Sequence, residues 1–210
     1  MKKRTMIFVT VMVLLFAMVT GSTLAYMTSK SGTVTNTFTY GNIKITIDEA
    51  PVDGNGKETT GNRVTSNEYK LVAGSTYDKD PTVHIQANSE SCYIFVNVQN
   101  NLLAAGLGGE TVETQMKAKG WTKATPTGAG TNCTVWYKAS AFAMSAEVQD
   151  VVLFETIDIA KGVEGSDNAP SSSIIIEAYA VQSANFDSAV KAYNAAPLKA
   201  TSAIWPSAIA

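Results

Sequence analysis

Few residues of this chain could carry acid–base, nucleophilic or metal chemistry. Its 210 residues include one histidine, His84, and two cysteines, Cys92 and Cys133. A catalytic zinc generally needs three protein ligands rich in histidine, and cysteine-based metal or redox sites use closely spaced CxxC pairs. Neither arrangement is available, and the sequence contains no GxSxG or HExxH motif. We therefore expect no enzymatic activity, no catalytic residue, and no bound metal or cofactor.

The histidine lies in an apolar segment that is typical of a strand. Val83 and Ile85 flank His84, so the imidazole falls on the polar side of that strand. The expectation is a surface histidine. A catalytic triad would require this one residue to meet a serine or cysteine and also a carboxylate.

Both cysteines fall on the apolar sides of predicted strands, at Cys92–Gln99 and Cys133–Lys138. If these strands are neighbours or lie on facing sheets, the two thiols approach to disulfide distance. A bridge would close a loop of about 40 residues, worth roughly 3–4 kcal/mol in the chain-entropy view. The alternative is two free thiols, buried as small hydrophobic side chains.

The N-terminus has the composition of an export signal. Basic residues 2–4 precede an uncharged apolar run from Met6 to Val19, and a segment of small residues ends at Ala25. We expect cleavage between Ala25 and Tyr26, secretion, and membrane contact only through the signal peptide (residues 1–25) before cleavage. The alternative is an uncleaved anchor, because the apolar stretch extended through Met27 nears the roughly 20 residues of a bilayer span.

Charge excludes one class of partner. The chain has 16 basic and 18 acidic residues, and loss of residues 1–25 removes three basic residues and no acidic one, which changes the net charge from −2 to −5. Nucleic acid is not an expected partner, because neutralising phosphates takes clustered lysine and arginine. An acidic protein is also not drawn to anionic membranes.

Alternation of apolar and polar residues dominates residues 26–210. Ile43, Ile45 and Ile47 are apolar at odd positions, whereas the preceding segment is apolar at even ones, so Gly41 marks a bulge or a change of partner. Many short strands between Gly, Asn and Ser turns predict one mostly β domain, a jelly-roll-like antiparallel β-sandwich. Further strands are expected at Tyr69–Val72, Thr82–Gln86, Cys92–Gln99, Cys133–Lys138, Val148–Ala160 (as one strand or two) and Ser173–Val181.

Two segments have helical rather than strand periodicity. They are Glu110–Lys119 and Phe186–Tyr193, the second with Ser183 or Asn185 as its N-cap. We expect two short peripheral helices that cover a sheet edge or end. Residues 50–67 are poor in apolar side chains and rich in turn formers, which predicts an exposed loop.

The start of the chain resembles the TasA/camelysin family of exported proteins. The resemblance rests on Gly21–Met27 and on Asn36–Ile47, where a Thr-Phe-x-x-Gly pattern precedes alternating isoleucines, and it continues more loosely over residues 69–99 and at the C-terminus. It implies cleavage by a signal peptidase of the SipW type, which would be a partner before export. It also implies a jelly-roll-like fold, secretion from a Gram-positive cell, and assembly into fibres of the biofilm matrix.

In fibres of this family, the segment after the signal peptide adds a strand to the next subunit. Here that segment is residues 26–40, with Val34, Phe38 and Tyr40 as the assembly strand. It suits strand addition because Val34 and Phe38 share one face, threonines lie between them, and proline is absent. Such a contact is heterologous, so it propagates into a filament. The alternative is that residues 33–40 pair within their own subunit.

Camelysin has been described as a metalloprotease, but a single histidine without HExxH does not support that activity here. The expectation is a secreted structural protein of the extracellular matrix or cell surface. It would be a fibre subunit or an accessory that associates with itself or with related subunits. The alternative is a monomeric cell-surface binding module for carbohydrate or protein, acting through the 50–67 loop and exposed aromatic residues.

Overall fold

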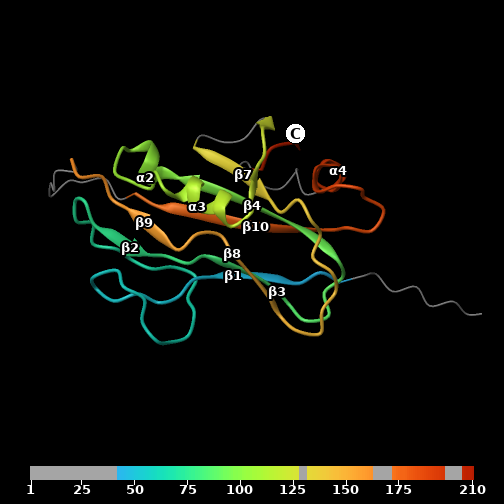
Figure 1. Cartoon of the computed structure of the whole chain (residues 1–210), viewed down its shortest axis with the longest axis horizontal. Helices are drawn as coiled ribbons and strands as arrows, with labels where there is room; N and C mark the ends of the chain where they lie inside the picture. Colours follow the sequence, from blue (N-terminus) through green and yellow to red (C-terminus); the bar gives the residue numbers. More distant parts are fainter. Residues whose placement is uncertain (1–41, 128–131, 163–171, 197–204) are drawn as a thin grey trace, which may run out of the picture. The chain divides into compact units, whose positions relative to one another are not determined.

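Among the described residues, antiparallel strands make up most of the regular structure, and three helices accompany them (Figure 1). The chain divides into two units, Met1–Tyr40 and Gly41–Ala210, and all the helices and strands described below belong to the second. The mostly β fold that was predicted from the alternation is confirmed. The computed structural model describes residues 42–127, 132–162, 172–196 and 205–210.

One sheet has three antiparallel strands in the order β1 (Ile45–Asp48), β3 (Thr82–Ile85) and β8 (Gln149–Val152). Alternate residues of each strand point to opposite faces. Ile45 and Ile47 pack against the core together with residues of β3 and β8, as the odd-position isoleucines predicted. The polar residues therefore gather on the opposite face of this sheet.

The pair β3–β8 continues into a second antiparallel pair, β2 (Thr76–Asp78) and β9 (Thr156–Asp158). Between the two pairs, the N–H of Leu153 donates to the carbonyl of Pro81 at 2.9 Å, which preserves the same register. The two pairs are thus one long ribbon. The predicted segment Val148–Ala160 forms two strands on one side of this ribbon.

The other large sheet has four antiparallel strands in the order β10 (Ile174–Gln182), β4 (Cys92–Asn100), β7 (Cys133–Tyr137) and β5 (Thr122–Lys123). The long central strand β4 is buried over most of its length. Its two faces contribute to different cores, because successive side chains point in opposite directions. Cys92, Ile94, Val96 and Val98 belong to one core, and Tyr93 and Phe95 to the other.

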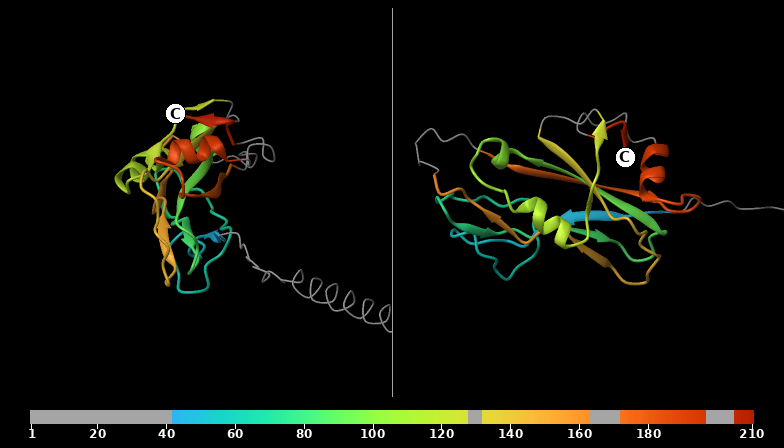
Figure 2. Two further views of the ribbon diagram at one scale, coloured as in Figure 1. Left: turned by 90° about the vertical axis from the view of Figure 1, so that its right-hand side faces the viewer. Right: turned by 45° about the horizontal axis from the view of Figure 1, so that its top comes forward.

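The first core is shared by the three-stranded and four-stranded sheets, since residues of both pack into it. The second core lies between the four-stranded sheet and the C-terminal elements (Figure 2). These elements are helix α4 (Ala189–Ala195) and the short strand β11 (Ala208–Ile209), which pairs with β6 (Pro126–Thr127). One sheet is therefore covered on both faces.

The two predicted helices are present, with shifted boundaries. The first is α3 (Val112–Ala118), which is followed by Gly120 at φ +76°, a conformation that glycine adopts without strain. Helix α4 starts later than predicted, because Ser188 is its N-cap and accepts from the N–H of Lys191 at 3.3 Å. The cap predicted at Ser183 or Asn185 is therefore wrong. An additional helical turn, α2 (Asn101–Ala104), was not predicted.

The strand predicted at Tyr69–Val72 is not formed. The hydroxyl of Tyr77 donates to the carbonyl of Lys70 at 2.6 Å and accepts from the N–H of Val72 at 2.8 Å. A side chain thus satisfies the backbone groups that a neighbouring strand would otherwise bind.

Most side chains of residues 50–67 are exposed, and two isolated β-bridges, Glu49 to Val64 and Val52 to Glu58, shape this loop. In the part of the chain that the structure describes, no helix is long and apolar enough to cross a membrane.

Candidate functional site

The polar face of the three-stranded sheet carries the histidine. His84 of the central strand β3 lies between Asp48 of β1 and Asp150 of β8. Its Nε2 is 2.8 Å from Asp48 Oδ1, and its Nδ1 is 2.6 Å from Asp150 Oδ1. The predicted side of the strand is right, but the side chain is only 14 % exposed. The expectation of a surface histidine is therefore wrong, because two carboxylates enclose the ring.

Both carboxylates can only accept hydrogen bonds from the ring nitrogens, because an ionised carboxylate has no hydrogen to donate. Burial lowers the pKa of His84, but hydrogen bonds to Asp48 and Asp150 and their negative charges raise it by more, so the net shift of the pKa is upward from the ordinary value. The contacts thus favour the doubly protonated imidazolium, which ties all three strands of the sheet together.

Arg63 connects the 50–67 loop to this cluster. Its Nε donates to Asp48 Oδ1, its Nη1 donates to Asp80 Oδ2 at 2.7 Å, and its Nη2 donates to the carbonyl of Asp80 at 3.0 Å. Burial raises the pKa of Asp48, but the bonds from Arg63 and His84 lower it by more, so the net shift is downward. The carboxylate is held in its ionised form between two cations.

In the long ribbon, β8 pairs with β3 and β9 pairs with β2. The sides of β8 and β9 that face away from these partners form one continuous edge. In an antiparallel pair, residues alternate between those that bond to the partner strand and those whose backbone groups point outward. Because Leu153 bonds to Pro81, the alternation assigns Asp150 and Val152 to the outward class. The same alternation assigns Thr156 and Asp158 to it in β9.

The β9 half of that edge is closed. The side chain of Gln115 in α3 accepts from the N–H of Thr156 at 3.1 Å and donates to its carbonyl at 3.0 Å, as a neighbouring strand would. The carbonyl of Asp158 accepts from the N–H of Gly109 at 2.8 Å. A Cβ on Gly108 would lie 2.1 Å from that carbonyl oxygen, so only glycine permits this close approach.

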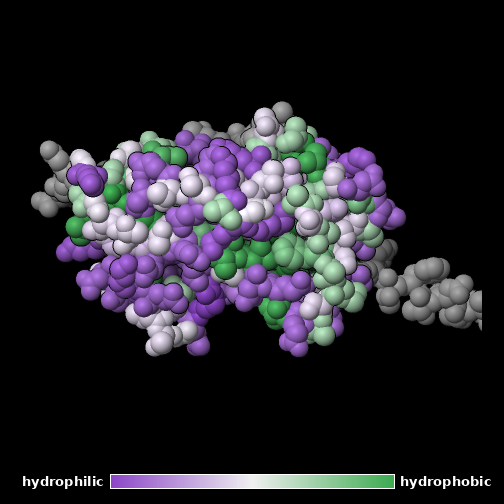
Figure 3. All heavy atoms as spheres, viewed as in Figure 1, coloured by the Kyte–Doolittle hydropathy of each residue, from purple (hydrophilic) through white to green (hydrophobic). Residues whose placement is uncertain are grey.

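The β8 half of the edge is open. Within the described residues, one outward backbone group of β8 has a partner: the carbonyl of Val152 accepts from Trp121 Nε1 at 3.0 Å. A groove of about 480 Å³ runs beside this edge, and hydrophobic atoms reach the surface near the position of β8 (Figure 3). Its lining residues are Lys119, Gly120, Lys138, Ala139, Ser140, Ala141, Phe142, Asp150, Val151 and Val152.

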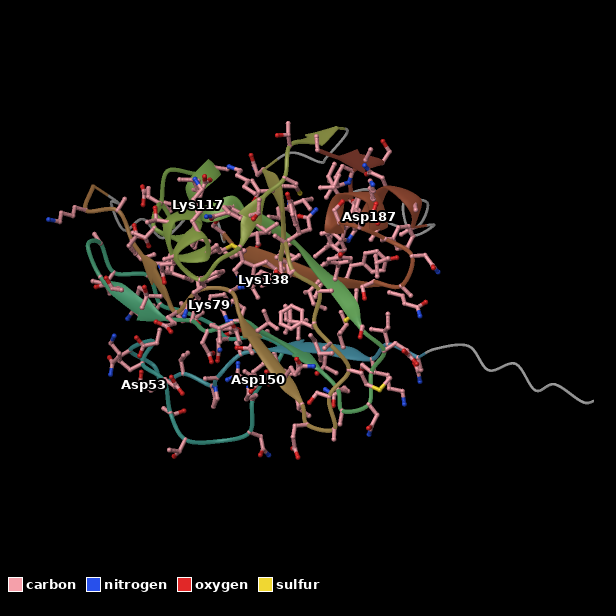
Figure 4. The ribbon with its side chains drawn as sticks, turned by 45° about the vertical axis from the view of Figure 1, so that its right-hand side comes forward. Asp53, Lys79, Lys117, Lys138, Asp150 and Asp187 are labelled. Carbon is pink, nitrogen blue, oxygen red and sulfur yellow. The ribbon has the colours of Figure 1, made fainter. Side chains whose placement is uncertain are left out.

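The wall opposite β8 is the chain that follows β7. The N–H of Lys138 donates to the carbonyl of Ile94, and Phe142 exchanges two backbone hydrogen bonds with Cys92. This wall is therefore held by β4 on one side and faces the groove on the other. Lys138 of this wall and Asp150 of β8 are labelled in Figure 4. Burial, together with the charge of Lys119, lowers the pKa of Lys138. The groove thus runs between an edge of each large sheet.

A second hollow, of about 440 Å³, lies beside α3, and Glu113, Lys117, Asn100 and Cys133 are among its lining residues. It differs from the groove because polar side chains from α3, β4 and β7 converge on it.

The predicted bridge between Cys92 and Cys133 is not formed, since both thiols are free. The two strands are indeed neighbours, but Cys133 pairs with Gln99, seven residues along β4 from Cys92. Gln99 and Cys92 also point to opposite faces of the sheet. The sequence predicted the faces as apolar or polar, but register decides which residues meet.

Other arrangements that could do chemistry are used structurally. Ser188 and Lys191 have the Ser-x-x-Lys spacing of some serine acyl-transfer enzymes, but Ser188 caps α4 and the Lys191 ammonium pairs with Asp187 at 2.6 Å. Asp53, in a turn of the 50–67 loop, accepts from the N–H groups of Asn55 and Lys57. Among the described residues there is no group of three His, Cys, Asp or Glu side chains that could hold a metal.

No protein-family model, curated protein or solved structure matches this chain. The functional argument therefore rests on the chain itself. The predicted cleavage site, Ala25 and Tyr26, and the predicted assembly residues Val34, Phe38 and Tyr40 lie outside the described residues.

Sequence reasoning missed the partners of His84 and the open edge of β8. The even-position charges Asp48 and His84 signal a polar face, but nothing local to the sequence brings Asp150 beside them. That contact depends on the strand order β1-β3-β8.

Proposed function

We propose that this chain is a secreted structural protein, a subunit or accessory of extracellular matrix fibres. Each copy adds residues 26–40 as a strand to the next copy. The observation that carries the proposal is the open edge of β8, with its groove, at Asp150 and Val152. The proposal also takes the two large sheets, which share a core, as the layers of a jelly-roll-like sandwich.

The composition of the donor segment supports the proposal. Between residues 33 and 40, threonine occupies every odd position, and Val34, Phe38 and Tyr40 occupy even ones. In an extended strand, these three side chains share one face. Burying Val34 and Phe38 against the apolar side chains of the groove would contribute roughly 1.5–3 kcal/mol each. The threonine face would remain in solvent.

The edge of β8 supports it from the acceptor side. An added strand gains hydrogen bonds from the outward N–H and C=O groups of Asp150 and from the N–H of Val152. It would place its apolar face toward Phe142 and Val151, which line the groove. The contact is heterologous, because the donor and the acceptor are different parts of the chain, so it extends without closing.

The experiment uses paired donor and acceptor variants of the exported chain, imaged by negative-stain electron microscopy. Phe38→Asp puts a charge on the buried face of the donor. Val152→Pro removes an outward N–H that β3 does not use, so the acceptor loses a donor while the ladder of its own sheet persists. Each variant should form no filaments. Thr37→Asp, with the same charge on the solvent face, is the matched control and should assemble.

Mixing the two variants tests the polarity of assembly. Phe38→Asp keeps its acceptor edge and Val152→Pro keeps its donor strand, so the mixture should give short complexes that end after one addition. Filaments of undiminished length from either variant alone, or from a chain lacking residues 26–40, would refute the proposal.

The second candidate function is a monomeric binding module, and the hollow beside α3 is the observation that favours it. Glu113 and Lys117, which pair with each other at 2.8 Å, line this space with a carboxylate and an ammonium, and such groups bind sugar hydroxyls or a polar peptide. Binding on a glycan array that Glu113→Ala abolishes, by a chain that stays monomeric, would select this function over the first.

A further inference from the structure

We propose that His84 is a pH-operated tie that holds the edge strand β8 in its sheet, so that protonation of one imidazole determines whether the open edge is ordered. The existence of the tie is independent of the proposed function. Its consequence for assembly, that an ordered β8 accepts a strand more readily, rests on the proposed function.

The argument begins with the number of protons. Each ring nitrogen of His84 faces a carboxylate oxygen, at 2.8 Å for Asp48 and 2.6 Å for Asp150. A neutral imidazole has one N–H, so it can donate to only one of the two carboxylates, whichever tautomer forms. The other nitrogen then turns a lone pair toward a negative charge. Loss of the proton therefore breaks one of the links between strands.

Because of the other charged residues around the ring, loss of the His84 proton affects Asp150 more than Asp48. Asp48 also accepts from Arg63, which in turn binds Asp80, so Asp48 keeps a cationic partner when His84 is neutral. Asp150 is 62 % exposed, and in the described residues its carboxylate has His84 as its partner. Lys44 precedes β1 on the same face, opposite Gln86 and two residues from Thr46. The link to β8 is the one without a substitute.

Because of the position of Asp150, loss of its link to His84 affects the open edge of the sheet. Strand β8 has four residues and is bonded to β3 on one side only. Asp150 is an interior residue of this strand, and its backbone groups point into the open edge. Short edge strands open locally at low free-energy cost. Without the tie, β8 should fray more often.

The direction of the pH effect follows from the raised pKa of the folded state. A histidine with a raised pKa contributes stability that is fully present below the unfolded value of about 6.5 and is lost as the pH rises through the folded value. The edge should therefore be most ordered in mildly acidic solution and least ordered in alkaline solution.

Because the chain contains one histidine, nuclear magnetic resonance of a preparation without a histidine tag reports His84 directly. The imidazole should titrate above 6.5, and Asp150→Asn should lower its pKa. Hydrogen exchange supplies the second readout. After correction for intrinsic rates, protection of the Val151 amide should fall roughly tenfold per unit of pKa shift as the pH rises through the transition. Protection of the Phe95 amide in β4 should not change.

The outcomes separate the tie from the proposed function. In His84→Gln and Asp150→Asn, protection of Val151 should be independent of pH. An imidazole pKa at or below 6.5, or Val151 protection that is unchanged in the wild type, overturns the tie. A titrating tie with filament growth that is insensitive to pH overturns only the assembly consequence. Absence of filaments at every pH overturns the proposed function and leaves the tie standing on its own readouts.

Discussion

The two halves of the ribbon edge differ: the β9 half is covered and the β8 half is open. Along β9, Gln115 binds both backbone groups of Thr156, and Gly109 binds Asp158. Along β8, which continues the same edge in the same register, Asp150 has no such cover within the described residues. Unpaired edges invite aggregation, and proteins usually cover them. The β9 half of this edge is covered, whereas the β8 half lies beside a groove. The β8 half is therefore suited to pairing with another strand.

The difference depends on what packs alongside each half. Helix α3 lies against β9 and delivers a side chain whose amide has both a donor and an acceptor. Beside β8 the neighbouring chain is held by β4, and the space between becomes the groove. Closure of an edge thus requires an element at hydrogen-bonding distance, and α3 supplies one along β9.

Breaking the closed half should have the largest effect. Gln115→Leu removes the bonds to Thr156 and the one to the N–H of Glu155, and leaves partly buried backbone groups without partners. We expect the free energy of unfolding to fall by about 2–3 kcal/mol, because each net hydrogen bond contributes about 1 kcal/mol. Chemical denaturation measures the loss, and hydrogen exchange of the Thr156 amide locates it.

Gln115→Glu is the matched control for this change. A carboxylate still accepts from the N–H of Thr156 but cannot donate to its carbonyl. The loss of stability should therefore lie between those of the wild type and Gln115→Leu. Equal losses in the two variants would show that packing, not the paired hydrogen bonds, closes this half of the edge.

Enlarging the open half should have an intermediate effect. Trp121→Phe removes the N–H that binds the carbonyl of Val152 and leaves a small void, because the indole is only 3 % exposed. A destabilisation of about 1–2 kcal/mol is expected from one hydrogen bond and a partly filled cavity. Under the proposed function, the freed carbonyl should also speed filament growth, which light scattering follows.

Slower growth of Trp121→Phe filaments would contradict this reading. It would mean that Trp121 orders the edge for its partner rather than occupying part of it. Lys138→Met is a useful control, because the Lys138 ammonium lies 4.9 Å from the Trp121 ring centroid and donates to the carbonyl of Lys119. That variant should leave exchange at the edge of β8 unchanged.

The alternation of apolar and polar residues in the sequence predicted which side of a strand faces the core. Ile45, Ile47 and Val83 were assigned to the core side, and His84 to the polar side, because the side-chain period of a strand is local. Strands of two or three residues, such as β5 and β6, are too short to show a period. Strand order and register are properties of the whole chain, so the separation of Cys92 from Cys133 and the meeting of His84 with Asp150 could not be predicted.

The smallest expected effect, and the most specific, is the pH dependence of global stability. The raised folded pKa of His84 means that unfolding releases its proton, so the wild type should lose stability as the pH rises through that pKa, by about 1.4 kcal/mol for each pH unit by which the pKa is raised. In His84→Gln, urea denaturation at pH 5.5, 7 and 8.5 should show no such loss. Since Asp48 keeps Arg63 at every pH while Asp150 depends on His84, Asp150→Asn should reduce the loss more than Asp80→Asn does. The opposite order would place the pH-sensitive link at β1, on the side of the sheet away from the open edge.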